Sequence, residues 1–521
     1  MKKILLLPLD ERPCNYDYTR LMTGDTDYEV VLPPKDILGR KKTPGSVERI
    51  WEWVEQTAPS CCGAVISIDT LVYSGILASR LHSFQESELL ARIERLRKLR
   101  ADNPTLRIFA FSLIMRNPQY SSADEEPDYY GVCGREIHRR GCILHKLELG
   151  IASEEEQAEL AQIERVLPQE HWNDYTSRRE KNLQVNLRAI DLTAEGVIDF
   201  LIIPQDDSSP YGLTAKDQQV VRAHIRETGQ LLRCYMYPDA DAVENTLTVR
   251  LINEQSGRRP LVYVKYASAL GGSVIPLYED RLINETIKYQ ILAAGGLCAT
   301  SASEADIILL VNTPSGKLLE HTPDAPLPRR IEYDANRNQI ELVEYADYAR
   351  RVLKKEICFA DVAYANGGDP ELFELLRLKG LLFRAAGYAG WNTSSNTLGT
   401  CIPCAMLHLL YGDRPAHFDF LALRYVEDVG YMAFVRSEVC REELEKYGCD
   451  YFRLDGPRGK VSRIIAEKLQ RFADEQLECE GRRVLIEDSC QPWNRMFEVG
   501  LRVKCIEALP GFRSRIQVIE G

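Results

Sequence analysis

DFLIIPQDDSSPYG, Asp199–Gly212, is the stretch that indicates the fold class of the chain. Its apolar run Phe200–Ile203 is typical of a parallel strand that is buried on both faces. Pro204 ends that run, and the carboxyl groups of Asp206 and Asp207 follow it. Folds built on a parallel sheet place their chemistry at the carboxyl ends of the strands. We therefore expect Asp206 and Asp207 to lie at such an end and to be catalytic.

Two neighbouring carboxylates are unfavourable, because like charges repel and partial burial raises the pKa of at least one of them. A reaction that needs one ionised and one protonated carboxyl group can use this difference. The sequence therefore predicts acid–base chemistry at Asp206 and Asp207.

Apolar, strand-like runs alternate with helix-like segments through about residue 410, which favours an α/β fold with a parallel sheet. The first expectation is a (β/α)8-like barrel with insertions, and the alternative is an open doubly wound parallel sheet. In the barrel, the runs near residues 4, 65, 109 and 201 are the first four strands, so Asp206 and Asp207 follow strand four. The predicted strands are residues 4–9, 28–32, 64–68, 107–114, 200–203, 231–237, 261–265, 306–311, 357–362 and 381–386.

At 521 residues, the chain has room for one large domain with additions or for two to three domains. We expect a catalytic barrel-like domain over residues 1–415, with a polar helical insertion at about 119–193, and a mixed α/β region over 416–521. Residues 120–130 are rich in Asp and Glu and are typical of a mobile loop over a site. Helices are predicted at 86–100, 154–166, 178–190 and 461–475, and no internal repeat is visible.

The charge and the cysteine content limit the possible partners and the location. The chain has 65 Lys and Arg against 77 Asp and Glu, a net charge of −12, which argues against a nucleic-acid partner. No stretch approaches the ~20 apolar residues that span a bilayer, and Pro8 and Asp10 interrupt the first apolar run, unlike a signal peptide. The 15 cysteines are scattered and odd in number, as in a reducing compartment. We therefore expect a cytoplasmic protein that has no membrane partner and that can form an oligomer.

Polar and aromatic residues recur just after the predicted strands. Because the carboxyl ends of parallel strands lie together, we expect these residues to gather at one end of the fold. Aromatic faces beside carboxylates and amides suit a sugar ring, because the apolar face stacks and the hydroxyl groups form hydrogen bonds. Each residue also has a structural explanation as a loop or helix cap. The candidate substrate-binding residues are Asp10, Glu11, Arg12, Asp69, Tyr73, Arg116, Tyr211, Asn312, Asn366, Trp391 and Asn392.

Cofactor motifs do not follow the predicted strands. The sequence contains no GxGxxG or P-loop pattern in that position and no GxSxG elbow, so we expect no cofactor and no metal. One alternative is a metal-assisted hydrolase or lyase on a small polar substrate, with oxygen ligands from Asp10, Asp69, Asp206 and Asp207. The other alternative is a non-catalytic sugar-binding protein on an open sheet.

Three motifs carry a resemblance to a known family: LPLDERPCN at Leu7–Asn15, IPQDDSSPYG at Ile203–Gly212 and GYAGWNTSSNTLGT at Gly387–Thr400. In these motifs the chain resembles the bacterial family called domain of unknown function 4127. The resemblance covers most of residues 1–410, and it implies no activity.

A second resemblance concerns the mechanism. An Asp-Asp pair at the end of a barrel strand is similar to the catalytic pair of retaining β-N-acetylhexosaminidases, which use the acetamide of the substrate as the nucleophile. This similarity implies that Asp206 orients the acetamide and that Asp207 is the general acid and base. It implies a carbohydrate substrate, from which a terminal β-linked N-acetylhexosamine, such as N-acetylgalactosamine, is released without a cofactor. The residues that it implies around the N-acetyl group and the ring are Tyr211, Asn312, Trp391 and Asn392.

Overall fold

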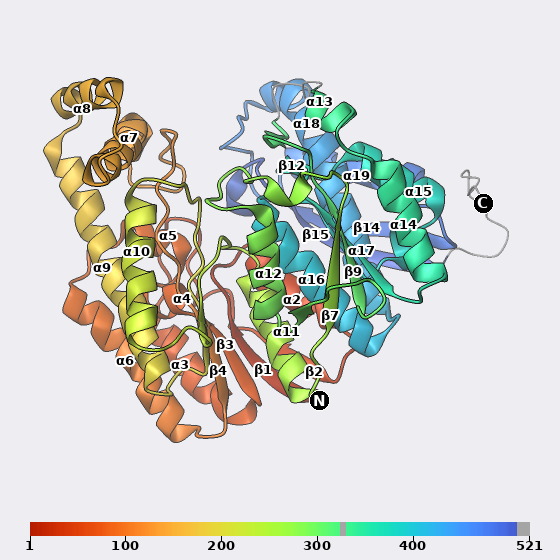
Figure 1. Cartoon of the computed structure of the whole chain (residues 1–521), viewed down its shortest axis with the longest axis horizontal. Coiled ribbons are helices and arrows are strands. Elements are labelled where there is room, and N and C mark those ends of the chain that lie inside the picture. The colour runs from red at the N-terminus through yellow and green to blue at the C-terminus, as the bar shows by residue number, and fades with distance from the viewer. Residues whose placement is uncertain (323–329, 508–521) are drawn as a thin grey trace. The chain divides into compact units, whose positions relative to one another are not determined.

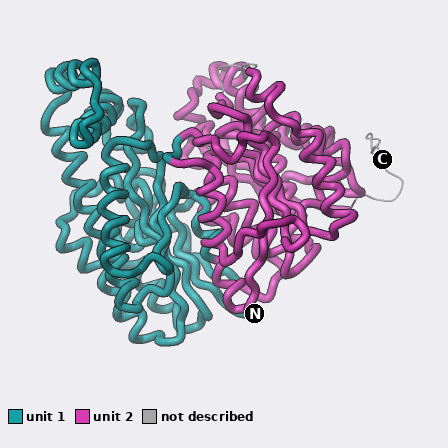
Figure 2. The backbone as a smooth tube through the Cα atoms, in the orientation of Figure 1, with its two compact units in different colours: residues 1–11, 29–247, 278–280 teal, residues 12–28, 248–277, 281–521 magenta. Residues whose placement is uncertain are grey.

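Residues 1–322 and 330–507, which the computed structural model describes, contain a six-stranded and a five-stranded β-sheet in two different parts of the chain, besides two sheets of two strands (Figure 1). These parts are two units, and the chain enters each of them more than once (Figure 2). Unit 1 consists of residues 1–11, 29–247 and 278–280. Unit 2 consists of residues 12–28, 248–277 and 281–521.

The first sheet has six strands in the order β2-β1-β3-β4-β5-β6. Its strands are β1 (Lys2–Leu7), β2 (Tyr28–Val31), β3 (Gly63–Ser67), β4 (Arg107–Phe111), β5 (Phe200–Ile202) and β6 (Cys234–Tyr235). Strand β1 pairs with β3, β3 with β4, β4 with β5 and β5 with β6, all in parallel. Every residue of β3 and β5 is buried, which explains why these strands are uninterrupted apolar runs in the sequence.

The helices of unit 1 connect these strands. They are α3 (Val47–Thr57), α4 (Ile68–Tyr73), α5 (Ile76–Leu81), α6 (Glu86–Asp102), α7 (Tyr130–Glu148), α8 (Glu154–Val166), α9 (Gln169–Ala194) and α10 (Leu213–Glu227). Helices α7, α8 and α9 all lie between β4 and β5 in the chain. The chain passes from unit 1 to unit 2 within α11 (Val243–Gln255).

The second sheet has five strands in the order β13-β11-β9-β7-β8, all paired in parallel. Its strands are β7 (Leu261–Tyr266), β8 (Leu297–Cys298), β9 (Ile307–Asn312), β11 (Glu356–Asp361) and β13 (Gly387–Ala389). Figure 1 shows α12 (Ile283–Ala293) and α16 (Ser394–Tyr411) on one side of β7 and β9, and α14 (Gln339–Arg351) and α15 (Pro370–Lys379) on the other.

The two sheets share one strand order. In each, the second strand in the chain lies outside the first, and the third, fourth and fifth continue on the other side. This strand order is that of an open doubly wound sheet, which is the alternative expectation, and the strands of residues 1–322 and 330–507 do not close into a single barrel. The alternation of strands and helices is the same in both architectures, and only the pairing distinguishes them. Because β2 belongs to the first sheet, Asp206 and Asp207 follow the fifth strand rather than the fourth.

One predicted strand is displaced. Residues 381–386 do not form a strand, because Leu382–Arg384 is a short 3-10 helix and the strand begins at Gly387. Helix α16 crosses β13 so closely that a Cβ at Gly387 would lie 2.5 Å from the carbonyl oxygen of Cys401. The glycine at the first position of β13 therefore permits the close approach of α16.

The C-terminal part of unit 2 is mixed. It contains α17 (Pro415–Arg424), a π-helix labelled η4 (Tyr425–Val435), α18 (Arg436–Glu442), α19 (Lys460–Gln476) and the antiparallel pair β14 (Arg482–Cys490) and β15 (Gly500–Glu507). The part of the prediction for this region beyond residue 507 lies outside the described residues. Among residues 1–322 and 330–507, no helix is both long and apolar enough to cross a membrane.

We predict that Leu201→Ala lowers the free energy of unfolding by about 2–5 kcal/mol, because it leaves a cavity in the middle of β5. Leu201 is 0% exposed, whereas Leu232 in the same unit is 83% exposed. Leu232→Ala is therefore the matched control, and chemical denaturation of both variants measures the difference. Equal losses in the two variants would contradict the placement of β5 in the core.

Candidate active site

The Asp206–Asp207 pair stands directly beyond β5. Sheet pairing continues as far as Gln205, which forms parallel bridges with Ile114 and Pro238. Asp206 and Asp207 then form a bend, in which Asp207 has a left-handed backbone conformation with φ 39°. Asp tolerates this region better than most residues, and such conformations concentrate at functional sites. The fold therefore places both carboxyl groups at the end of a buried strand, as predicted.

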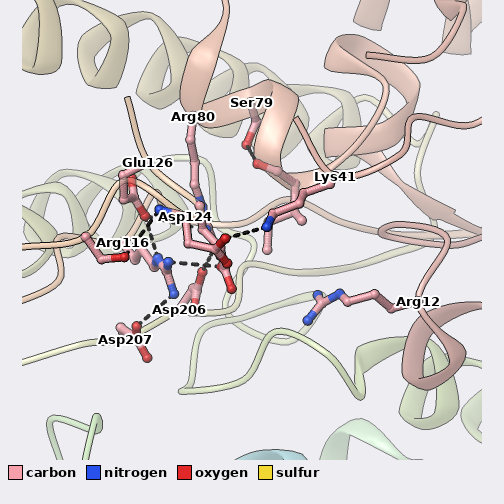
Figure 3. Close-up of polar contacts among 12 residues, drawn as sticks. Arg12, Lys41, Ser79, Arg80, Arg116, Asp124, Glu126, Asp206 and Asp207 are labelled. Atoms are coloured by element: carbon pink, nitrogen blue, oxygen red, sulfur yellow. Dashed lines mark hydrogen bonds and ion pairs between the residues drawn. The ribbon is translucent and has the colours of Figure 1, made fainter. Parts of the chain in front are cut away.

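Each member of the pair binds a different arginine (Figure 3). Oδ2 of Asp206 accepts a hydrogen bond from Nη2 of Arg80 at 2.5 Å, and Oδ2 of Asp207 accepts one from Nη1 of Arg116 at 3.1 Å. The side chains of Arg80 and Arg116 are 3% and 10% exposed, and those of Asp206 and Asp207 are 13% and 18% exposed. Both aspartates therefore keep some accessible surface, while the guanidinium groups that hold them are almost fully covered.

The environment of Asp207 favours its protonated form. Burial, followed by the negative charge of Asp206, raises the pKa of Asp207 to about 7, although Arg116 and Arg80 act in the opposite direction. Asp207 therefore exchanges its proton near neutral pH beside an Asp206 that forms an ion pair with Arg80. A pKa near the working pH is what general acid–base chemistry requires of Asp207.

The acidic segment before α7 supplies two more carboxylates to the same arginines. Oε2 of Glu125 accepts hydrogen bonds from Nη1 of Arg80 and from Nη2 of Arg116, both at 3.0 Å. Oε1 of Glu126 accepts one from Nε of Arg116 at 2.7 Å and one from Nη1 of Arg80 at 3.5 Å. The site is therefore a network of two guanidinium groups and four carboxyl groups.

A sharp turn between α4 and α5 brings Arg80 to this network. Ser67 caps the start of α4, where its Oγ accepts a hydrogen bond from the Thr70 amide at 3.2 Å. Helix α4 ends at Ser74 with φ 77°, and Gly75 follows with φ 134°. Because side chains rarely allow the conformation of Gly75, glycine is needed for the turn into the helix that carries Arg80.

Helices α7 and α9 support Arg116 through its backbone. The carbonyl oxygen of Arg116 accepts hydrogen bonds from Oη of Tyr175 at 2.7 Å and from Nη1 of Arg179 at 3.2 Å. The next turn is fixed in the same way, because Oη of Tyr130 donates to the carbonyl oxygen of Pro118 at 2.7 Å. Tyr130 and Tyr175 belong to the hydrophobic cluster between these helices. The helical section between β4 and β5 thus holds the loop that carries Arg116.

Asp69 has a structural position in unit 1. Its Oδ2 accepts a hydrogen bond from the Leu113 amide at 2.9 Å, which ties the turn after β4 to α4. Burial raises the pKa of Asp69 to about 7, and the bonds from Leu113 and Ser79 oppose this shift only in part.

The other predicted residues of unit 1 contact different elements. Asp10 is buried directly after β1. Oε1 of Glu11 accepts a hydrogen bond from the Lys41 amide at 3.0 Å. The Tyr73 ring lies 4.9 Å from the His82 ring, and the Tyr211 ring lies 6.1 Å from the His145 ring on α7.

In unit 2, three predicted residues line one pocket: Arg12, Trp391 and Asn392. Trp391 is only 5% exposed, and its Nε1 donates a hydrogen bond to Oγ1 of Thr400 at 3.1 Å, so most of its ring belongs to the core. Asn392 is in the left-handed region with φ 50°. The other walls of this pocket come from Pro13, Cys14, Tyr18, Glu427, Met432, Phe497, Glu498 and Val499.

Asn312 and Asn366 join other networks of unit 2. Nδ2 of Asn312 donates to Oδ1 of Asp361 at 2.9 Å and to Oδ2 of Asp369 at 3.2 Å, and Asn312 is 0% exposed. The Asn366 amide donates to the carbonyl oxygen of Asn392 at 2.8 Å. Asn312 is thus a bridge between two buried carboxyl groups.

Arg80, Glu125 and Glu126 were not among the predicted site residues. Arg80 stands well beyond the end of β3, within a second helix, so a search of strand ends does not reach it. The acidic run that contains Glu125 and Glu126 was visible in the sequence, but its arginine partners were not.

Within 1–322 and 330–507, no group of three or more His, Cys, Asp or Glu residues is placed to hold a metal ion. The set Asp10, Asp69, Asp206 and Asp207 therefore does not form such a group.

A family model described as "Protein of unknown function (DUF4127)" matches residues 4–502. No curated protein matches the chain.

We predict that Asp69→Asn becomes more stable relative to the wild type as pH rises from about 4 to about 7. The raised pKa of Asp69 means that the folded state holds a proton more tightly than the unfolded state, so stability from this proton is full at low pH and lost as pH rises through about 7. Asn cannot ionise and avoids this loss, which amounts to about 4 kcal/mol at most. Denaturation at several pH values measures the effect.

Asp128→Asn is the control, because the Asp128 side chain is 99% exposed. Its stability difference from the wild type should stay nearly constant with pH. A constant difference for Asp69→Asn as well would show that Asp69 ionises normally in the folded protein.

Proposed function

The chain belongs to this family of proteins of unknown function, and from the chemistry of its Asp206–Asp207 pair we propose that it is a glycoside hydrolase. It releases terminal β-linked N-acetylhexosamine from carbohydrates by a retaining mechanism in which the acetamide of the substrate is the nucleophile. N-acetylgalactosamine is the first epimer to test. The observation that carries the proposal is the pair itself: two adjacent carboxyl groups stand at the end of a buried strand, each held by its own arginine, and burial together with the charge of Asp206 raises the pKa of Asp207 to about 7.

In the first step, protonated Asp207 donates its proton to the oxygen of the leaving group. The carbonyl oxygen of the acetamide attacks C1, the bond from C1 to the leaving oxygen breaks, and an oxazolinium ion forms. Asp206 accepts a hydrogen bond from the acetamide N–H and stabilises the positive charge. Asp207 is left as a carboxylate.

In the second step, the Asp207 carboxylate removes a proton from water while the water oxygen attacks C1. The oxazolinium ring opens, the acetamide is restored, and Asp207 is again protonated. A general acid that also serves as a base needs a pKa near the working pH, which the burial of Asp207 supports.

The position of the pair favours this scheme over direct displacement. A retaining enzyme with a carboxylate nucleophile has two carboxyl groups on opposite sides of the scissile bond, at about 5 Å from one another. Consecutive residues of one bend more readily present both groups to the same side of a sugar. Arg116 contacts Asp207 directly, and the other predicted binding residues of the same unit are Asp10, Glu11, Asp69, Tyr73 and Tyr211.

One observation favours an alternative, a non-catalytic sugar-binding protein. Both sheets are open and doubly wound, whereas the resemblance to hexosaminidases concerns a barrel strand. Measurable binding of N-acetyl sugars without turnover over a broad panel of substrates would support this alternative. The cytoplasmic location and the possibility of an oligomer remain parts of the proposal.

We predict that Asp207→Asn reduces hydrolysis of a β-N-acetylhexosaminyl disaccharide by roughly 10²–10⁴-fold, since that is the usual contribution of proton donation. Aryl glycosides with acidic leaving groups should lose much less in their first step. Asn is the suitable replacement because it tolerates the left-handed backbone at this position. Asp206→Asn should lose activity on all N-acetyl substrates.

The measurement is the hydrolysis of paired β-N-acetylgalactosaminides and β-N-acetylglucosaminides, with the exposed-site variant Asp128→Asn as the control. Full activity of Asp207→Asn on the disaccharide would disprove the role of Asp207 as the acid.

A further inference from the structure

Three consecutive acidic residues before α7, Asp124 to Glu126, bind basic side chains from three different parts of unit 1, and Figure 3 shows Asp124 and Glu126 among these contacts. Asp124 forms an ion pair with Lys41, which follows β2. Glu125 and Glu126 bind Arg80 from α5 and Arg116 from the turn after β4. Residues 120–130 are therefore fastened to the site by charge at three successive positions.

The two arginines connect this segment to the catalytic pair. Nη1 of Arg80 is directed to Glu125 and Glu126, and its Nη2 is directed to Asp206. Arg116 divides its donors in the same manner, because Nε and Nη2 bind the glutamates and Nη1 binds Asp207. Since a guanidinium group is planar, bonds on one edge fix the direction of the other.

Burial makes this coupling strong. The Glu126 side chain is 1% exposed and the Arg80 side chain is 3% exposed, so water does not screen their charges effectively. One oxygen of Glu126, Oε2, is buried without a hydrogen-bond partner in the described residues. The carboxyl group of Glu126 is thus held by the two arginines through Oε1.

We propose that Glu125 and Glu126 are positioning residues for Asp206 and Asp207, acting through Arg80 and Arg116. They fix both guanidinium planes, and they take a share of the positive charge that would otherwise act on the pair. For catalysis the inference rests on the proposed function, because it assigns these residues to the same site. For the electrostatics of Asp207 it stands on the contacts alone.

The same contacts specify the charge of the substrate. Four carboxyl groups face two guanidinium groups, so the network stays negative even when Asp207 carries its proton. An anionic group near the pair is repelled, and an uncharged sugar is not. The inferred substrate is therefore a neutral N-acetylhexosaminide rather than a sulfated or phosphorylated one.

Several charged and titratable groups face Asp207, and the charge of each decides whether it favours or opposes protonation of Asp207. The carboxylates favour its proton and the arginines oppose it. These groups are Asp206, Arg116, Arg80, Glu125 and Tyr120.

We predict that Glu126→Gln and Glu125→Gln shift the alkaline limb of the kcat/KM profile to lower pH by about one unit, because each removes a negative charge beside the arginines. Arg116→Gln should shift it to higher pH, because it removes a positive charge. Opposite shifts from the two sides of one network are not expected from a general loss of structure. The Gln variants should also accept sulfated substrates better, relative to neutral ones, than the wild type does.

Glu159→Gln is the matched control. Glu159 binds Arg139 on the surface of α7 and α8, so the variant has the same change of charge at another place in unit 1. It should leave the profile unchanged. An unchanged profile in Glu125→Gln and Glu126→Gln as well would overturn the inference.

A readout without a substrate separates this inference from the proposed function. Selective ¹³C labelling of aspartate carboxyl carbons, with Asp207→Asn for the assignment, follows the titration of Asp207 by NMR. A lower midpoint in Glu126→Gln supports the inference even if no glycoside is hydrolysed, and that second result would reject only the proposed function. An unmoved midpoint overturns the inference even in an active enzyme. Glu125, with a side chain that is 19% exposed, supplies the second variant if Glu126→Gln does not fold.

Discussion

Two buried guanidinium groups are the constraint on which the site depends. A charge removed from water costs several kcal/mol unless it is paired, and Arg80 and Arg116 are paired with four carboxyl groups that have the same need. Much of unit 1 serves to hold this network in place. The turn at Gly75 sets the direction of α5, the helix that carries Arg80. Tyr130 and Tyr175 fix the backbone around Arg116.

The local elements could be predicted from the sequence, and their pairing could not. Parallel strands buried on both faces are continuous apolar runs, so β3 and β11 were placed within one or two residues, and the capping box of Ser153 and Glu156 marks the start of α8. Strand order depends on contacts that are distant in the sequence. The same alternation is compatible with one barrel or two open sheets, and the shared strand order of the two units left no visible repeat in the sequence.

The site was predictable to the extent that it lies at strand ends. Asp206, Asp207 and Arg116 are predicted in this way, and they belong to one network, in which Arg116 binds Asp207 and Arg80 binds Asp206. Arg80 was missed because a helix and a turn separate it from β3, so only the folded chain brings it to Asp206. Strand ends also gave Asn312, whose buried bonds to Asp361 and Asp369 are structural in character. A residue's position after a strand therefore does not show whether its side chain is buried in hydrogen bonds, as in Asn312, or accessible, as in Asp207.

The central claim is that one network keeps the two neighbouring carboxyl groups in different protonation states. Neutron diffraction from crystals of the deuterium-exchanged protein at slightly acidic pH locates those protons directly. The account predicts a deuteron on the carboxyl group of Asp207 and none on that of Asp206, whose oxygen faces Arg80. Two bare carboxylates, or a deuteron on Asp206 instead, would contradict it.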